Sequence, residues 1–122
     1  LQVFLGGGLG AVSRFLLSKR FNELKLPTAF PFGTVAVNML GCFAIGFLFQ
    51  TIAREAVPKR FQLFLMTGFL GGFTTFSSFS LETANLISSG HVAAALANVL
   101  LSVVPGLALV ALGMAAAARL FG

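Results

Sequence analysis

Charged residues are scarce in this sequence. Only 9% of its 122 residues are Asp, Glu, Lys or Arg, and 57% are hydrophobic, whereas soluble domains carry about 25% charged residues. This composition excludes an ordinary soluble domain and indicates an integral membrane protein. Because one helical crossing takes roughly 20 residues, four helices would use nearly the whole chain. We therefore expect an all-α fold in which residues 1–122 form a single four-helix transmembrane domain.

Cysteine and histidine are almost absent. The single cysteine, Cys42, lies within an apolar run, and the single histidine, His91, follows a glycine in a polar turn. One residue of each kind, so far apart, provides neither a disulfide framework nor a zinc site. The sequence also contains no Ser-His-Asp set and no phosphate-binding loop, so we expect no enzyme activity.

Short polar connections divide the chain into four apolar segments. The connections read KRFNELKLPTAFP, REAVPKR and SSGH, and they contain prolines, charged residues or glycine. Each segment is long enough to cross a bilayer as a helix; they run from about Leu1 to Ser18, Phe32 to Ala53, Phe61 to Ser88 and Val92 to Phe121. Because the connections are short, we expect successive helices to run antiparallel, with both termini on one side.

The few charges are mostly basic, and they flank the apolar segments. The net charge of +5 would suggest nucleic acid in a soluble protein, but cations at the ends of membrane spans contact lipid headgroups. We therefore expect membrane lipid, and no nucleic acid, as a partner. The predicted side of the termini holds Arg54, Lys59, Arg60 and Arg119, against Lys19, Arg20 and Lys25 on the other side, with Arg14 added if it reaches outward. Such an even distribution permits insertion both ways up and pairing as an antiparallel dimer; alternatively, another factor sets one orientation.

The stretch Gly68 to Ser80, GFLGGFTTFSSFS, combines three glycines with five hydroxyl residues inside an apolar segment. Glycines weaken a helix, and Ser and Thr side chains can bond the backbone groups that a break sets free. The stretch therefore favours a helix broken in mid-membrane, whose exposed carbonyls are suited to bind a cation. The alternative is an unbroken helix in which the glycines and hydroxyls only pack.

The first segment carries small residues and one internal cation. Gly6 and Gly10 form a small-xxx-small pair that lets another helix approach closely. Arg14 follows one turn later on roughly the same face. Because an arginine is costly in lipid, it either reaches the interface or faces a watery vestibule in which anions would collect.

The second segment contains an amide side chain, Asn38, deep within its apolar run. Thr34, Asn38 and Gly41 lie at helical spacing on a single stripe. An amide this deep in a span needs hydrogen-bond partners, either across a helix interface or along a transport pathway.

Two phenylalanines and a carboxylate follow the glycine-rich stretch. Phe76 and Phe79 lie three residues apart on one helical face. Phenylalanine ordinarily packs, but its ring has a positive edge that can stabilise a small anion. Glu82 is the only acid within the apolar segments, so it is a candidate gate, proton carrier or pore-mouth ligand, or else an interfacial, hydrogen-bonded carboxylate.

The last segment has its own polar stripe. Asn98 and Ser102 are one turn apart on the same face, and Pro105 removes a backbone donor and bends the helix there.

Three motifs together resemble the small fluoride channels of the Fluc (CrcB) family. They are GxxxR at Gly10 to Arg14, GTxxVNxxGxFxxG at Gly33 to Gly46, and GFxGGxTTFSSFSxE at Gly68 to Glu82. Their order and spacing are those of the family, and the similarity spans nearly the whole chain. Each motif alone would be weak, but the three together are highly specific.

The resemblance implies a fluoride-selective channel that exports fluoride passively from the cytoplasm across a prokaryotic cell membrane. It implies an antiparallel, dual-topology homodimer with two pores, and a structural sodium ion bound by the backbone carbonyls of Gly71 and Thr74. The residues that would form or border the fluoride path are Phe76 and Phe79, Asn38, Arg14 near the aqueous vestibule, and Thr75, Ser102 and Glu82 along the polar track or at its mouth.

The sequence departs from the family pattern at two positions. One turn after Ser102, where relatives can continue the hydroxyl track, this chain has Gly106, which leaves open how far the polar line extends. Ser78 replaces a threonine that is common in the third motif, and this change keeps the hydroxyl group.

Two other functions compete with this interpretation. A proton-coupled drug exporter can also be a small four-helix, dual-topology dimer, but such proteins place a carboxylate in the first span and use Trp and Tyr around the substrate. This first span has no acid, and Trp and Tyr are absent from the chain. A subunit that only assembles with other proteins is the remaining alternative, and it would transport nothing by itself.

Overall fold

The structure, a computed structural model, describes all 122 residues, and every regular element in it is helical. In chain order the elements are α1 (Gln2–Glu23), α2 (Phe32–Ala53), the 3₁₀ turn η1 (Lys59–Phe61), the π-helix η2 (Leu63–Leu70), α3 (Gly71–Phe73), α4 (Phe76–Ser88) and α5 (Val92–Phe121). The elements from η1 to α4 together make up the third predicted segment. The all-helical fold with four helical segments is therefore confirmed.

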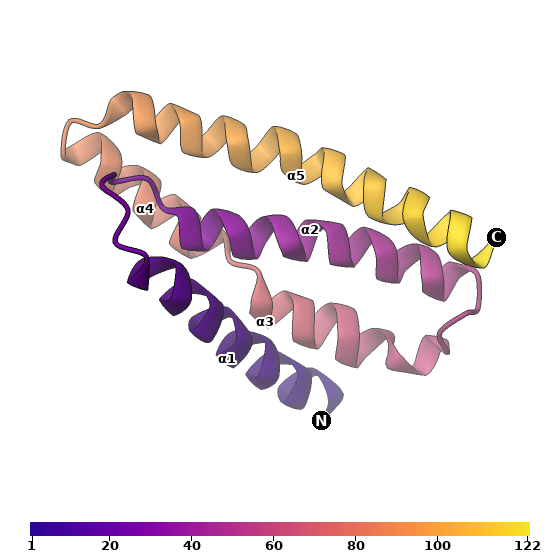
Figure 1. The fold of residues 1–122 in the computed structure, drawn as a ribbon. Helices are drawn as coiled ribbons and strands as arrows, with labels where there is room; N and C mark the ends of the chain where they lie inside the picture. The colour runs from indigo at the N-terminus through magenta and orange to yellow at the C-terminus, as the bar shows by residue number, and fades with distance from the viewer.

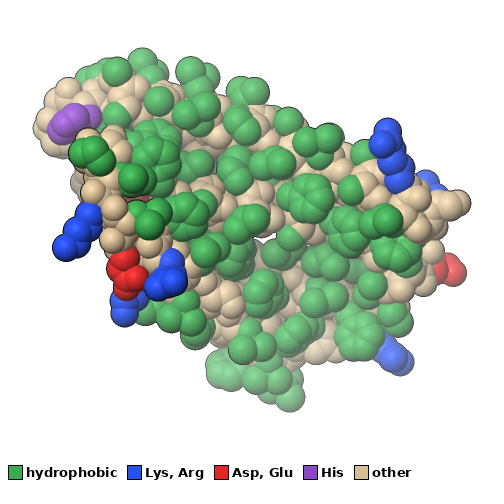
Figure 2. All heavy atoms as spheres, in the orientation of Figure 1, with side chains coloured by type: hydrophobic (Ala, Val, Ile, Leu, Met, Phe, Trp, Pro, Cys, Tyr) green, Lys and Arg blue, Asp and Glu red, His purple; other side chains and the backbone are tan.

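The four segments lie side by side, with α1 inclined to the others (Figure 1). The loops after α1 and α4 lie at one end, and the loop after α2 lies at the other end with the C-terminus, toward which the N-terminus also points. Charged side chains gather at these two ends, with an apolar band between them (Figure 2). This distribution is that of a protein whose middle lies in lipid.

Three of the four segments are long and apolar enough to cross a membrane, namely Phe32–Ala53, Lys59–Ser88 and Val92–Phe121. The first helix has sufficient length, because its 22 residues span about 33 Å at 1.5 Å per residue. However, it is rich in glycine and ends in charged residues, so it is less apolar than the other three segments. It also continues to Glu23, past the predicted limit at Ser18, and Arg20 and Glu23 pair one turn apart at 3.6 Å.

The third segment is broken at Thr74 and Thr75. These two residues have extended backbone, with φ/ψ of −86°/157° and −149°/119°, and α4 begins only at Phe76. The sequence suggests that the glycines interrupt the helix, but Gly71 and Gly72 are still helical, so the break lies after them. The break begins at two β-branched threonines, whose hydroxyl groups offer the backbone other hydrogen bonds than those of a helix.

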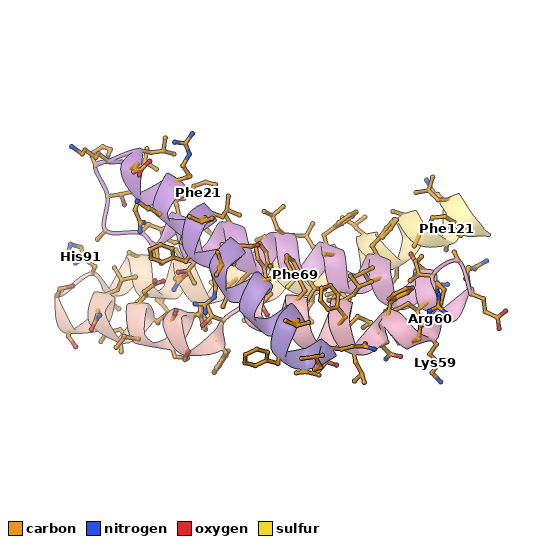
Figure 3. All side chains as sticks on the ribbon, turned by 90° about the horizontal axis from the view of Figure 1, so that it is seen from below. Phe21, Lys59, Arg60, Phe69, His91 and Phe121 are labelled. Carbon is orange, nitrogen blue, oxygen red and sulfur yellow. The ribbon has the colours of Figure 1, made fainter.

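The glycines serve close packing against α1. A Cβ atom built on Gly10 would clash with the Phe69 carbonyl and would lie 2.9 Å from the Phe73 nitrogen. A Cβ atom built on Gly6 would likewise clash with the Phe64 carbonyl and would lie 2.9 Å from the Phe69 nitrogen. Figure 3 shows α1 crossing the third segment obliquely beside Phe69. The predicted small-residue contact of Gly6 and Gly10 is thus confirmed, and its partner is η2 and α3.

A second contact between small residues joins α2 to α5. A Cβ on Gly46 would clash with the backbone of Val110, and one on Gly113 with the backbone of Phe43. Both glycines are buried. Close approach of this kind is how helices associate when lipid offers no hydrophobic drive between them.

We expect Gly10→Ala to lower the thermal stability of the purified protein in detergent. The new methyl group would overlap the backbone of the third segment, and overpacking of this kind costs about 1–3 kcal/mol. Gly8→Ala is the matched control on the same helix, because a Cβ there would meet nothing within 4 Å. The control should be as stable as the wild type or slightly more so, and equal melting temperatures for the two variants would contradict the contact.

Candidate functional site

The break in the third segment is held by one amide side chain. Asn38 of α2 donates from Nδ2 to the Thr75 carbonyl at 3.1 Å, and the Thr75 N–H donates to Asn38 Oδ1 at 2.9 Å. The Thr75 hydroxyl then caps α4 by accepting from the Ser78 N–H at 3.2 Å. The N–H groups of Thr75 and Ser78, which the interrupted helix leaves without helical acceptors, are thus bonded within the protein, as a lipid environment favours.

Four carbonyls, those of Gly71, Gly72, Phe73 and Thr74, lose their helical donors at the break. In a continuous helix the Gly71 carbonyl would accept from the N–H of Thr75, and the Thr74 carbonyl from that of Ser78. Both N–H groups are bonded to side chains instead. The Gly72 carbonyl gains a new donor, because Arg14 Nε donates to it at 3.0 Å. Arg14 forms no ion pair with an acid.

A hollow beside the break, here named the phenylalanine cavity, has a volume of about 420 Å³. Its wall brings together seven of the residues that the sequence singled out, from three different helical segments: Asn38, Gly71, Thr74, Thr75, Phe76, Phe79 and Ser102. The rings of Phe76 and Phe79 are 5.6 Å apart, centroid to centroid, and tilted by 43°. The Phe76 side chain is 79% exposed in the single chain.

A second hollow, here named the Arg14–Glu82 cavity, has a volume of about 280 Å³ and mostly polar walls. Thr34 donates its hydroxyl hydrogen to Glu82 Oε1 at 2.7 Å, while Oε2 is buried without a partner. Arg14 and Glu82 line this cavity without an ion pair between them. The two other candidates for the path thus share one polar compartment.

Thr75 lines both cavities. The N-terminus of α4 therefore separates the two compartments, and the residues that the sequence predicted for a pathway fall on both sides of it.

Sequence reasoning missed several polar residues around these cavities. Ser18 and Asn22 line the Arg14–Glu82 cavity; they follow Arg14 at intervals of four residues, and this stripe is a signal that could have revealed them. The contact of Thr34 with Glu82 lies across 48 residues of sequence, and no local pattern indicates it.

These features define a class: a small helical membrane protein with a broken helix, bordered by two cavities whose walls include short hydroxyl and amide side chains. Comparison with known proteins identifies the family. A family model described as CrcB-like protein, Camphor Resistance (CrcB), matches residues 1–114. The chain belongs to this family.

Close relatives match along their whole length. A fluoride-specific ion channel FluC from Salinibacter ruber is 45% identical over 122 residues, which cover all of this chain and 91% of the relative. Proteins of the same name from Salmonella arizonae and Salmonella newport are 44% identical over 124 residues, covering 98% of this chain and 96% of each relative.

We expect Asn38→Leu to open the break. Leucine cannot replace the donor or the acceptor of the amide, so the Thr75 N–H would lose its partner and exchange with solvent. Hydrogen–deuterium exchange read by mass spectrometry should then be faster in peptides that contain Thr75. Asn85→Leu is the control, because Asn85 is exposed and lies, like Thr75, on the third segment. Equal exchange at Thr75 in both variants would show that Asn38 does not hold the break.

Proposed function

We propose that this chain is one subunit of a fluoride-selective ion channel, as the names of its relatives indicate. It is a channel and not an enzyme. The observation that carries the proposal is the phenylalanine cavity, because it collects a set of anion-stabilising groups, Asn38, Thr75, Phe76, Phe79 and Ser102, and contains no charged side chain.

The chemistry of this wall suits a small, strongly hydrated anion. Fluoride gives up its water only where hydrogen-bond donors or positive ring edges replace it at short range. The Asn38 amide, the Thr75 and Ser102 hydroxyls and the two rings are groups of this kind. A buried lysine or arginine would bind fluoride so well that it could not leave. Larger halides would regain less from the same groups for the water they lose.

Arg14 and Glu82 fit the mouth of such a path. Arg14 adds positive charge to the smaller, more polar Arg14–Glu82 cavity, where it would raise the local concentration of anions. Thr75 borders both cavities, so it is the residue that we propose passes the ion between them. The hydrogen bond from Thr34 to Glu82 holds the carboxylate at the side of the Arg14–Glu82 cavity.

We propose that two such subunits form an antiparallel, dual-topology homodimer with two pores. Support comes from the exposure of the broken segment, since Gly71, Phe76 and Ser77 face outward in the single chain. Irregular backbone is tolerated in lipid only where protein covers it, and a second copy would provide that cover. The near-even distribution of basic residues between the two ends supports opposite orientations.

We also propose a structural sodium ion between the subunits. Its ligands would be the carbonyls of Gly71 and Thr74, whose helical donors are bonded elsewhere. Carbonyl oxygens are suitable ligands for alkali cations, and a second subunit would double their number. Bound there, the ion would supply positive charge that balances the carbonyl dipoles at the break.

The cellular role that we propose is passive release of fluoride across a bacterial membrane. In an acidic medium fluoride enters as the neutral acid and dissociates inside, so a channel lets the anion flow out down its gradient. For this role all four segments, including α1, would cross the membrane as one domain over residues 1–122.

Liposomes that contain only this purified protein should release fluoride rapidly and chloride hardly at all. Ion-selective electrodes for the two halides provide the measurement. Phe76→Ile should reduce fluoride release, because isoleucine fills similar space without a positive ring edge. Silence for both ions, in protein shown to be folded and dimeric, would contradict the proposal and favour a drug exporter or an assembly subunit.

Replacing sodium with choline at equal ionic strength should lower the thermal stability of the dimer and increase the monomer fraction. Without the cation, the carbonyls of Gly71 and Thr74 would face one another uncompensated across the interface. Differential scanning fluorimetry and size-exclusion chromatography provide the two measurements. Identical results in both salts would argue against a structural ion.

A further inference from the structure

A chain of hydrogen bonds joins α5 to α4 behind the phenylalanine cavity. Asn98 of α5 is completely buried, with 0% of its surface exposed. Its Nδ2 donates to Thr83 Oγ1 at 2.8 Å, and the Thr83 hydroxyl donates to the Phe79 carbonyl at 2.7 Å. From the other side, Ser102 donates its hydroxyl hydrogen to Asn98 Oδ1 at 3.4 Å.

The shortest contact determines in which direction the hydrogen bonds of this network are donated. Two oxygens 2.7 Å apart need a hydrogen between them, and the Phe79 carbonyl has none, so the hydrogen belongs to Thr83. A hydroxyl has only one hydrogen, so towards Asn98 Thr83 can only accept. The NH₂ group of Asn98 must therefore face Thr83, and its Oδ1 must face Ser102.

This direction has a consequence for the cavity wall. Ser102 lines the phenylalanine cavity, whereas Asn98 and Thr83 lie behind it. With its hydrogen directed at Asn98, Ser102 presents lone pairs to the cavity, and these repel an anion. An anion gains the Ser102 donor only if the hydroxyl rotates away from Asn98. At 3.4 Å that bond is long and weak, so the rotation is easy.

We propose that Asn98 is a positioning residue that competes with the transported anion for the hydroxyl hydrogen of Ser102. The competition weakens anion binding in the phenylalanine cavity, so that a bound ion can leave. Conduction needs this balance, because a site that binds too tightly does not release its ion. The inference rests on the proposed fluoride conduction and adds to it a residue that does not touch the ion.

The test is fluoride flux into or out of liposomes, measured over a wide range of fluoride concentration for the wild type and Asn98→Leu. With its competitor removed, Ser102 should donate freely to fluoride. The half-saturating concentration should fall by about two- to tenfold, which corresponds to the typical net contribution of one hydrogen bond. The variant should thus carry relatively more flux at low fluoride and relatively less at high fluoride.

Thr83→Val provides a second variant that nearly preserves the shape of the side chain. Without Thr83, the Asn98 amide can turn its NH₂ group toward Ser102, and the Ser102 hydrogen then points into the cavity. The same shift in half-saturation is expected, so Thr83→Val decides the question if Asn98→Leu does not fold. Thr51→Val is the matched control: Thr51 is 2% exposed and donates to the Phe47 carbonyl one turn back at 2.6 Å, away from the cavity. Its flux curve should match that of the wild type.

The effect must also depend on Ser102. In a Ser102→Ala background, Asn98→Leu should no longer change the half-saturating concentration. A flux reduced by the same factor at every concentration, or a shift that persists without Ser102, would overturn the inference and leave Asn98 a purely structural residue. A silent wild type would overturn the proposed function and this inference together. An active wild type with unshifted folded variants would overturn this inference alone.

Discussion

The two hydrogen bonds between Asn38 and Thr75 are the interaction on which the rest of this structure depends. A helix interrupted within lipid exposes backbone groups that each cost several kcal/mol when unpaired. One asparagine satisfies a donor and an acceptor of the same residue, at 2.9 and 3.1 Å. Neither leucine nor an ionised aspartate could do both. The break can persist only because α2 places the Asn38 amide beside the backbone of Thr75.

The break in turn determines which groups are available for ions. Thr75 and Ser78 direct their N–H groups to side chains, so the carbonyls of Gly71 and Thr74 lack their helical donors, while Arg14 bonds the Gly72 carbonyl between them. Carbonyl oxygens without donors attract cations, and the hydroxyl, amide and ring-edge groups on the neighbouring wall attract anions. One local interruption of a helix therefore generates surfaces of opposite preference within a few residues.

The sequence predicted what depends on composition and local period. Three spans, the Gly6 and Gly10 contact and the stripe of Thr34, Asn38 and Gly41 all follow from such patterns. It did not predict the π-helix at Leu63–Leu70, or the exact position of the break. Both depend on how the third segment packs against α1 and α2, and neighbours in space are not encoded in a local pattern.

Side-chain partners were the least predictable feature. Asn98 and Ser102 were recognised as one polar stripe, and Glu82 as the only acid within the spans. Their partners Thr83 and Thr34 lie 15 and 48 residues away. Pairing across helices depends on the rotation of each helix about its axis, which is set by packing with all its neighbours at once. The sequence left the choice between vestibule and interface open for Arg14, and it does not indicate that Arg14 Nε donates to the Gly72 carbonyl.

The packing of the helices and the geometry of the candidate site therefore depend on the same glycines. A Cβ on Gly41 would collide with the Thr74 methyl group, and one on Gly72 with the Gly7 carbonyl of α1. The absence of side chains at these positions lets α1 and α2 approach the break from both sides. That approach brings Arg14 within 3.0 Å of the Gly72 carbonyl and Asn38 within reach of Thr75. In so small a protein the glycines that bring the helices together are therefore as necessary to the geometry of the two cavities as the residues that line them.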